Sequence, residues 1–480
     1  MRRSRKWSLL VGGIAVGLAG AAYGAEPTTQ DLLDKINALQ AQVNTLQAQG
    51  AASAQPSVAS ATTTPSDAQI AGATQHVLAE ANAHDSFLDA STGMTAGWNT
   101  SKQQFFIASD DGNFYFHPGI AFQERYAADY RNTPDTWTNG FETRRMKFYF
   151  DGYVFSPDLT YKFQWQDSTA GGAPTIEYAW GQYVFWHDVG PLDGNVGVKI
   201  GQTKNYASKE QAIVGDTNQP LVERSLLDST IGGNALGGPL VEGVDFVYTG
   251  DKTPLHMDLM FNDGNSSGLG NFTDVTPAGA QNNFGAAVRA DYKVFGDWAD
   301  NGDLTGKQAQ NNFLDFGAGA DFTQGVTAVP VGTPASDAYR WDLDAQYTMA
   351  NTFVVYGAFE GDFIQADGTP GKVVSHHDLN TGELIEGGYF LNPALELVAR
   401  YDVSNFDDHY KVGGQNLFQE AGIGANWFLG QDGSWGNHAK FTFDVNYLPN
   451  GNPTATGLDY LASPADHTAV VIRGQFQLWL

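Results

Sequence analysis

Basic side chains recur at every second position in runs that are apolar on one face and polar on the other. In the stretch RRMKFYFDGYVFSPDLTYKFQWQ, Arg145 and Lys147 alternate with apolar residues, and Lys162 does the same after the FSPD turn. A period of two places such residues on one face of a β-strand. A guanidinium binds an oxyanion through its planar fork, whereas an ammonium binds it as a point charge. The spacing therefore predicts strand faces that attract anions.

The candidate anion-path residues extend along the first strand-like runs and into the longest connector, residues 205–240. The candidates are Arg125, Arg145, Lys147, Lys162, Lys199, Lys204, Lys209 and Arg224. Carboxylates occupy the same polar faces, at Asp151, Asp245, Asp258, Asp291, Asp342, Asp344, Asp402 and Asp444. A basic wall opposite an acidic wall gives a transverse field, which does not by itself select anions. For each basic residue, the alternative is a salt bridge to an adjacent carboxylate.

Other chemistries have weak signals in this sequence. His376, His377 and Asp378 are adjacent, but neighbouring residues of an extended chain point to opposite sides, so a polar external loop is the simpler interpretation. The stretch FNDGNSSGLGN lacks the spacing and closing glutamate of an EF-hand. Neither a nucleophile elbow nor a P-loop motif is present, and there is no cysteine. We therefore expect no catalytic residue, no metal site, no cofactor and no enzymatic activity.

The N-terminal region carries the features of an exported protein. Residues 1–24 combine a basic start with an apolar core and small residues, as in a signal peptide. Its removal leaves 22 basic and 53 acidic residues, a net charge of −31 that argues against nucleic acid as a partner. Residues 25–49 have the coiled-coil seam Leu32, Ile36, Leu39, Val43 and Leu46, with an amphipathic helix lying on its own chain as the alternative. Residues 50–103 are interpreted as a flexible linker and lead-in, and residues 104–480 as the main body.

The main body alternates between apolar and polar residues in about sixteen runs. They lie near residues 114–127, 142–155, 159–167, 175–187, 195–204, 241–249, 255–262, 283–295, 313–322, 339–349, 352–362, 382–391, 394–404, 419–430, 438–448 and 468–480. Short and long connectors alternate between them. Aromatic residues cluster near the ends of the apolar faces, at Trp165, Tyr178, Trp180, Trp341, Tyr347, Trp427 and Tyr447.

These features predict an all-β fold, a 16-stranded antiparallel transmembrane β-barrel preceded by a short coiled-coil helix. The apolar face then contacts lipid, the aromatic residues form girdles at its edges, and the polar face lines a water-filled pore. The last run ends on Trp479 and Leu480, and an apolar terminal residue is typical of bacterial outer-membrane barrels. The alternative fold is a soluble secreted β-sandwich that acts as a binding protein.

With the strands placed, the sequence resembles the phosphate-selective porin O/P family of bacterial outer-membrane channels. The resemblance rests on ETRRMKFYFDGYVFSPDLTYKFQWQ, on VGVKIGQTKNYASKEQ followed by QPLVERSLLDST, and on two later segments, ALELVARYDVSNFDD and AGIGANWFLGQDGSWGNHAKFTFDVNYL. It spans roughly residues 110–480 at uneven strength, and the order and spacing of these segments carry it.

The resemblance implies a porin in the bacterial outer membrane, a sixteen-stranded barrel that is usually a homotrimer and has one loop folded into the pore. The 205–240 connector would be that constriction loop. The implied function is a diffusion channel for small hydrophilic solutes, including anions such as phosphate. A non-selective or cation-preferring general porin is the alternative, because acidic residues are as numerous on the inward faces as basic ones.

Overall fold

The computed structural model describes residues 93–100, 102–132, 135–167, 174–232, 239–264, 284–327, 335–366, 376–411, 414–453 and 468–480. The chain divides into two units, Met1–His84 and Asp85–Leu480, and all described residues belong to the second. The predicted signal peptide (1–24), coiled-coil helix (25–49) and most of the predicted linker (50–103) lie outside the described residues, so these domain assignments stay predictions.

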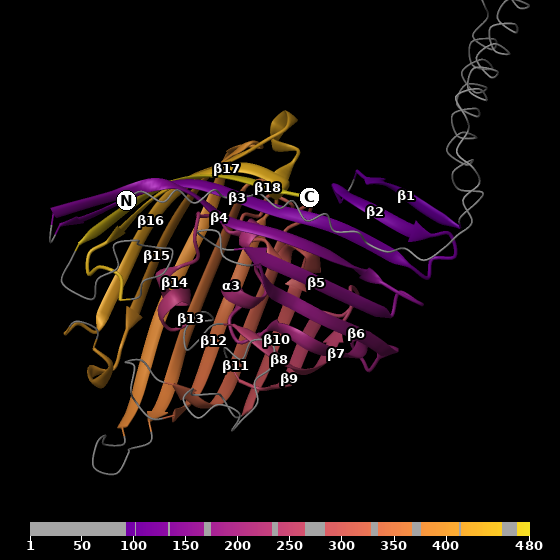
Figure 1. The fold of residues 1–480 in the computed structure, drawn as a ribbon, viewed down its shortest axis with the longest axis horizontal. Coiled ribbons are helices and arrows are strands. Elements are labelled where there is room, and N and C mark those ends of the chain that lie inside the picture. Colours follow the sequence, from indigo (N-terminus) through magenta and orange to yellow (C-terminus); the bar gives the residue numbers. More distant parts are fainter. Residues whose placement is uncertain are drawn as a thin grey trace, which may run out of the picture. The chain divides into compact units, whose positions relative to one another are not determined.

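Sixteen antiparallel strands form the body of the molecule (Figure 1). The first eight are β3 (Tyr115–Asn132), β4 (Asp135–Tyr153), β5 (Leu159–Asp167), β6 (Thr175–Val189), β7 (Gly194–Lys204), β8 (Leu240–Thr249), β9 (Leu255–Asn262) and β10 (Phe284–Phe295). The other eight are β11 (Phe313–Thr327), β12 (Ala335–Met349), β13 (Phe353–Ala366), β14 (His376–Asn392), β15 (Leu395–Asn405), β16 (Leu417–Phe428), β17 (Ala439–Leu448) and β18 (Ala469–Trp479).

The sheet closes on itself because its last strand pairs with its first barrel strand. Each strand from β3 to β17 pairs with the next, and β18 returns to β3 in a register that runs from Ala469 opposite Arg131 to Trp479 opposite Ala121. Closure leaves no unpaired edge in this ring. The predicted 16-stranded antiparallel barrel is confirmed, and the soluble β-sandwich alternative is wrong because the strands form one closed sheet.

A short hairpin precedes the barrel within the segment that the sequence suggested was a lead-in. It consists of β1 (Met94–Asn99) and β2 (Gln104–Ser109), paired antiparallel, and β2 also makes two residue pairings with the start of β3. The hairpin therefore extends the sheet beyond the ring at the end where β3 begins.

The outer surface of the ring is an apolar belt. On strand after strand, the side chain at mid-strand is apolar and exposed in the isolated chain. The belt includes Phe148, Phe163, Ile200, Phe246, Leu259, Val288, Phe316, Leu343, Phe359, Ile385, Leu397, Ile423 and Phe443. Polar side chains alternate with them and are buried on the inner face. A continuous apolar belt around a closed sheet is the surface that hydrocarbon solvates, so the barrel is of the transmembrane type.

Connections differ in length at the two ends of the barrel. At the short-connection end, the turns between β4 and β5, β6 and β7, β12 and β13, and β14 and β15 have two to five residues. The connection from β7 to β8 at the other end carries α3 (Lys209–Ala212), the 3₁₀ helix η1 (Asp216–Asn218) and α4 (Leu226–Thr230). Four further 3₁₀ helices are η2 (Trp298–Gly302), η3 (Asp408–Tyr410), η4 (Gln431–Gly433) and η5 (Gly436–His438).

Among the described residues, no helix has the length and apolar character needed to cross a bilayer.

Two sequence interpretations need correction. His376, His377 and Asp378 begin strand β14 instead of lying in an external loop. Tyr178 and Trp180 face the lumen instead of forming part of an outer girdle, because the register between β5 and β6 shifts at Gln164 and Trp165. A bulge of this kind adds one residue to one strand and reverses the facing of the residues on one side of it.

Candidate functional site: a charged passage beside the inward loop

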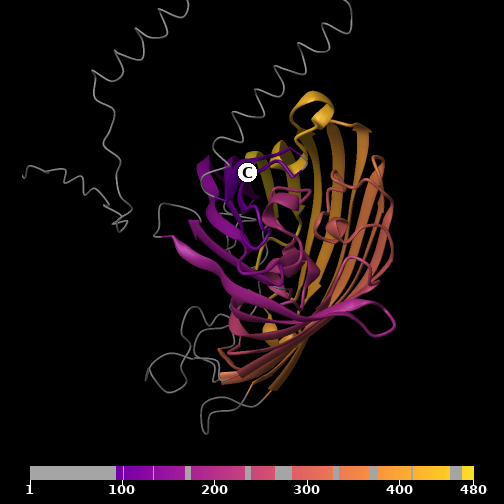
Figure 2. The same ribbon diagram turned by 90° about the vertical axis from the view of Figure 1, so that its right-hand side faces the viewer.

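The described part of the connection from β7 to β8, residues 205–232 and 239 and here called the inward loop, lies inside the barrel (Figure 2). Leu226, Leu227 and Lys209 are fully buried within it. Glycine on the wall lets the loop approach closely, because a Cβ added at Gly382 would lie 2.2 Å from Leu227 Cδ1. The predicted constriction loop is thus placed in the lumen.

Wall carboxylates hold the inward loop by its backbone. Four of them accept hydrogen bonds of 2.9 to 3.2 Å from loop amides. The amides of Lys209, Val222, Leu226 and Leu227 donate to Asp342, Asp444, Glu420 and Asp402, in that order. A carboxylate bound to a backbone N–H makes a charge-assisted bond. The loop is therefore fixed to strands β12, β15, β16 and β17.

The inward loop also reaches the seam where the barrel closes. Gln123 on β3 donates to the Asp216 backbone oxygen at 3.2 Å and to Gln477 on β18 at 2.9 Å. Gln477 in turn donates to the Thr217 backbone oxygen at 3.0 Å. The first and last barrel strands are therefore both bound to the same turn of the loop.

Many carboxylates on strands β10 to β17, here called the filled side, bind an arginine or lysine within hydrogen-bonding distance. Arg289 contacts Asp291, Asp342 and Asp344, and Arg400 contacts Glu386, Asp402 and Glu420. Arg473 pairs with Asp444, Arg340 with Asp321, and Lys209 with Asp315. The acidic wall expected from the sequence is present, but its carboxylates bind arginines and the inward loop and do not face an open channel.

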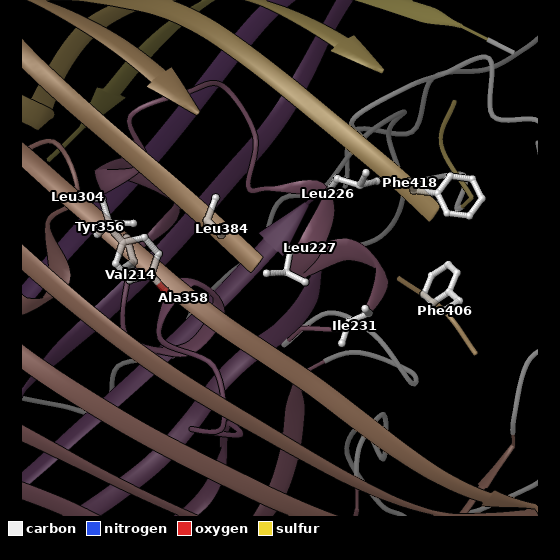
Figure 3. Close-up of a cluster of buried hydrophobic side chains, with 10 residues drawn as sticks. All are labelled: Val214, Leu226, Leu227, Ile231, Leu304, Tyr356, Ala358, Leu384, Phe406 and Phe418. Atoms are coloured by element: carbon white, nitrogen blue, oxygen red, sulfur yellow. The ribbon is translucent and has the colours of Figure 1, made fainter. Parts of the chain in front are cut away.

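An apolar cluster completes the packing on the filled side (Figure 3). Its members come from the inward loop, from the β10–β11 connection and from the wall: Val214, Leu226, Leu227, Ile231, Leu304, Tyr356, Ala358, Leu384, Phe406 and Phe418. Burial of such side chains contributes on the order of 1.5–3 kcal/mol each. The inner face of the barrel is therefore not uniformly polar, as the sequence had suggested, but contains a small core.

The β10–β11 connection, at the short-connection end, also folds into the barrel. Leu304 and Thr305 are buried, and Gln346 on the wall donates to the backbone oxygens of Asp300 and Asp303 at 3.0 Å. Its Gly302 oxygen accepts a 2.9 Å hydrogen bond from Asn218 of the inward loop. The two connections meet and occupy the lumen along the filled side.

Strands β3 to β7, here called the passage side, carry the basic residues singled out from the sequence. Arg125 contacts Glu142 and Glu223, and Arg145 lies 3.1 Å from Glu223 and 3.6 Å from Asp216. Lys147 binds Glu177 at 2.7 Å and also Asp216, which Arg224 contacts from within the loop. Lys204 lies 3.9 Å from Glu177 and donates to the Gln211 oxygen.

Arg144 belongs to the same charged cluster, although strict alternation missed it. The register between β3 and β4 shifts at Gln123 and Glu124, so two consecutive arginines of β4 reach Glu223. A β-bulge places neighbouring residues on the same side of a sheet. The signal in the sequence was the Arg-Arg pair itself, which a regular strand would have split between the lumen and the lipid.

The two loop carboxylates at the centre of this cluster are ionised at neutral pH. Burial alone would raise the pKa of Glu223, but Arg144, Arg145 and Arg125 outweigh it and hold that pKa well below its usual value. Burial acts in the same way on Asp216, and Lys147, Arg224 and Arg145 hold its pKa well below the ordinary value. The loop is therefore attached to the passage side by fully charged pairs.

Lys162 differs from the other cations of the passage side. Its ammonium lies 4.9 Å from the ring centroid of Tyr178 and 5.7 Å from that of Tyr149. Within the described part of the chain it forms no ion pair, and Asp151, which faces it across the β4–β5 register, binds His117 at 3.0 Å. Lys162 thus presents a positive charge that no carboxylate contacts directly.

A cavity of about 490 Å³ separates the passage side from the inward loop. The charged residues that line it are five cations, Lys102, Arg145, Lys147, Lys162 and Lys204, and three carboxylates, Asp151, Glu177 and Asp216. A second cavity of about 710 Å³ opens among the turns at the short-connection end, and it shares Lys102, Gln104, His117, Tyr149 and Trp479 with the first. We call the two together the passage, and its inner part has a surplus of two positive charges.

The structure brings most of the predicted anion-path residues to the passage, but not all. Arg145, Lys147, Lys162 and Lys204 line it, and Arg125 and Arg224 bind the carboxylates at its edge. Lys199 instead bonds the Tyr206 hydroxyl at 2.6 Å and Asp245 at 3.4 Å. Lys209 lies on the filled side against Asp315, 2.7 Å away.

Among the residues that the structure describes, two groups of side chains have the composition of a cation site. Asp378, Asp407 and His409 lie together where β14 and the β15–β16 connection meet, and Asp291, Asp315 and Asp344 lie together on the filled side. The second group already contains Lys209, whose ammonium is 2.7 Å from Asp315 and 3.8 Å from Asp344. Lys209 and Arg289 therefore already bind the carboxylates of this group.

Comparison with known proteins identifies the fold but not a sequence family. No family model matches this sequence, and no curated protein does. Among solved structures, the chain is similar to an anion-selective porin from Comamonas acidovorans, with 9% identity over 76% of this chain and 99% of that one, at a TM-score of 0.50. This similarity shows the fold, a β-barrel of the porin type.

Other barrels of similar fold are more distant by the same measure. OmpF of Salmonella typhi, solved with daunomycin, has 14% identity over 77% of this chain and 99% of its own, with a TM-score of 0.49. OprB of Pseudomonas putida has 12% identity over 77% of this chain and 95% of its own, with a TM-score of 0.48.

Proposed function

We propose that this protein is a porin of the bacterial outer membrane, a passive channel through which small hydrophilic solutes diffuse, and not an enzyme. The porin-type barrel, its apolar belt and the cavity inside it support this proposal. In barrels of this type the short connections face the periplasm, so the passage would open toward the periplasm through its larger cavity.

We further propose that the passage favours anions. The observation that carries this proposal is the distribution of charge between the two sides of the lumen. Carboxylates of the filled side bind buried arginines and loop amides, whereas the inner passage has five cations against three carboxylates. Charges further away act weakly, because salt screens them over about 8 Å at physiological ionic strength. The local surplus therefore outweighs the net charge of the chain.

Phosphate is the anion that the resemblance to the phosphate-selective porins suggests. Arg145 and Lys147 would provide a guanidinium fork and an ammonium, although both are engaged by Glu223, Glu177 and Asp216. The homotrimer is a proposal of the same kind, because it too follows from that resemblance. For residues 1–24 and 25–49 we retain the proposed signal peptide and coiled-coil helix.

The test is the reversal potential in a potassium chloride gradient across a planar bilayer. Wild type should prefer chloride, and Lys162→Gln should lower the chloride-to-potassium permeability ratio roughly two- to fivefold, because a unit charge ~4 Å away is worth ~1 kcal/mol in water. The triple variant Arg145→Gln, Lys147→Gln, Lys162→Gln should shift the ratio further toward cations. In the triple variant Glu223 and Asp216 also lose partners, so the single variant is the cleaner measurement.

The matched control is Lys252→Gln. Lys252 is exposed in the turn between β8 and β9 and lies 3.6 Å from Asp188, outside the passage. Its replacement removes the same charge and should leave the reversal potential unchanged. A wild-type channel that prefers potassium, or a Lys162→Gln variant that behaves like the control, would contradict the anion proposal and favour the general or cation-preferring porin. Phosphate binding predicts in addition that millimolar phosphate reduces the chloride current.

A further inference from the structure

The passage has an aromatic lining that diffusion of hydrated inorganic ions does not explain. Tyr115, Tyr149, Tyr178 and Trp479 all line the inner cavity, and they come from β3, β4, β6 and β18. Apolar ring surface next to water is unfavourable unless something covers it. A wall that only needed charge would be built from short polar side chains. The rings therefore point to a solute with an apolar surface of its own.

Two of these rings are held rigidly. The Tyr149 hydroxyl donates to the Leu480 backbone oxygen at 2.7 Å and accepts from the Trp479 indole N–H at 2.5 Å. Gly119 makes room for this arrangement, because a Cβ there would lie 2.2 Å from Tyr149 Cζ. His438 stacks on Trp479, with ring centroids 4.6 Å apart and an interplanar angle of 9°. Tyr149 and Trp479 thus form a fixed aromatic shelf, which binds without the entropic cost of ordering side chains.

Tyr178 completes the site from β6, which is separated from β4 by one strand. The bulge between β5 and β6 turns it into the lumen, where it shares the Lys162 ammonium with Tyr149. In the described part of the chain its hydroxyl has no hydrogen-bond partner. The site therefore offers a cation without a bound carboxylate, a free hydroxyl and ring surfaces, all within one cavity of about 490 Å³.

We propose that this site recognises small carboxylates that carry a flat aromatic ring. The carboxylate would bind the Lys162 ammonium and the Tyr178 hydroxyl, while the ring would lie against the aromatic side chains of the cavity. Offset or edge-to-face contact between rings adds attraction beyond the burial of area. Inorganic anions and open-chain acids would contact only the Lys162 ammonium and the Tyr178 hydroxyl, and not the aromatic rings. This proposal rests on the proposed channel function and names the solute class of the same passage.

The test compares three monovalent carboxylates as blockers of the potassium chloride current through the wild-type channel: benzoate, cyclohexanecarboxylate and acetate. Benzoate should block at a roughly three- to tenfold lower concentration than cyclohexanecarboxylate, because only benzoate can form ring–ring contacts. Acetate should be the weakest. Equal block by benzoate and cyclohexanecarboxylate in a conducting channel would overturn the inference and leave the channel proposal intact. The absence of any current would instead overturn the channel proposal.

Variants assign the effect to the site. In Tyr178→Leu, benzoate and cyclohexanecarboxylate should block at about the same concentration. Each block is measured relative to the variant's own chloride current. Tyr178→Phe should keep the preference, since it keeps the ring. Tyr183→Leu is the matched control, because Tyr183 lies on the same strand, β6, but is 49% exposed on the outer surface. A benzoate preference that survives in Tyr178→Leu, or disappears in Tyr183→Leu, would contradict the assignment.

Discussion

Arg400 on β15 and Lys162 on β5 are both cations on the inner face of one barrel, yet their surroundings are opposite. Arg400 is fully buried and contacts Glu386, Asp402 and Glu420. Lys162 lines a cavity and contacts two aromatic rings but no carboxylate among the described residues. The filled side uses charge to hold a loop, whereas the passage side leaves some of its charge accessible to solutes.

Because of this difference, the number of inward charges alone does not give the charge that a solute in the barrel would meet. A carboxylate that accepts a backbone N–H and faces an arginine contributes little field to a channel beyond it. Only charges that line the free volume and lie within a screening length act on a passing ion. Each of the following predictions tests the contrast between the two sides.

The largest expected effect is the loss of Arg400. Arg400→Met leaves three buried carboxylates without their cation, and removal of one partner from such a group costs about 3–5 kcal/mol of unfolding free energy. Lys162→Met, on the passage side, should cost less than about 1 kcal/mol, because no carboxylate depends on it. Urea unfolding of the barrel in lipid vesicles, followed by tryptophan fluorescence, measures both values. Equal losses would mean that the two sides are not built differently.

The next prediction concerns both faces of the wall. Arginine placed on the apolar belt, as in Phe163→Arg or Leu343→Arg, should cost about 2–4 kcal/mol near the midplane of the bilayer. Arginine at the neighbouring inner positions should have different effects on the passage side and on the filled side. Lys162→Arg retains a charge in water and should leave the unfolding free energy unchanged. Asp344→Arg places a cation against Arg289 and Lys209 and should prevent folding.

Heat-modifiable mobility on gels, with urea unfolding of the variants that fold, checks these four variants. If Asp344→Arg folded as well as Lys162→Arg, the tight packing of the filled side would be disproved. If Phe163→Arg did not lower the unfolding free energy, the assignment of Phe163 to the outer face of β5 would be wrong.

The smallest effect is a pH dependence from the inward loop. Burial, assisted by the charge of Glu210, raises the pKa of Asp228 on α4 to about 7, from an ordinary value of 3.8. Between these values the unfolded chain releases the proton and the folded chain keeps it, so stability falls as the pH rises toward 7 and the loss is complete above it. Asp228→Asn cannot ionise and should be more stable than wild type by about 1–3 kcal/mol at pH 8.

The same two proteins should have nearly equal stability at pH 4, where Asp228 is largely protonated in the folded chain and half protonated in the unfolded one. Urea midpoints at pH 4 and pH 8 provide the comparison. Asp228→Glu, which keeps a carboxylate, should retain the pH dependence. A difference between wild type and Asp228→Asn that is the same at both pH values would show that Asp228 acts through packing and not through its charge.

The sequence predicted all sixteen barrel strands because alternation is a local property of each strand. Its errors occur where facing depends on a neighbouring strand. Arg144 and Tyr178 face the lumen because of register shifts, which depend on pairs of strands and are not visible in one of them. Strand ends at the long-connection end were also underestimated, as in β14, which begins at His376 and not near residue 382.

The site was predicted in part for the same reason. The basic residues of the first strands were found, since their spacing and sign are both local. Their partners were not found, because they are distant in the sequence. Glu223 is 98 residues away from Arg125, and Asp444 is 222 residues away from Val222, whose amide donates a hydrogen bond to the Asp444 carboxylate. The folding of the β10–β11 connection into the barrel has no signal in the alternation pattern, and it confines the passage to one side.

The bonds that join Gln123, Gln477 and the turn at Asp216 and Thr217 have a consequence for how the protein assembles. The seam joins the first barrel strand, β3, to the last one, β18, so it can form only after the whole barrel sequence has been synthesised. The inward loop that binds both strands lies midway along the sequence. We therefore expect closure and loop docking to be coupled, and we expect both to be slow because their contacts join residues far apart in the sequence. A newly inserted chain would remain open and leaky until its constriction was in place, so the pore is narrowed in the same step that seals the wall.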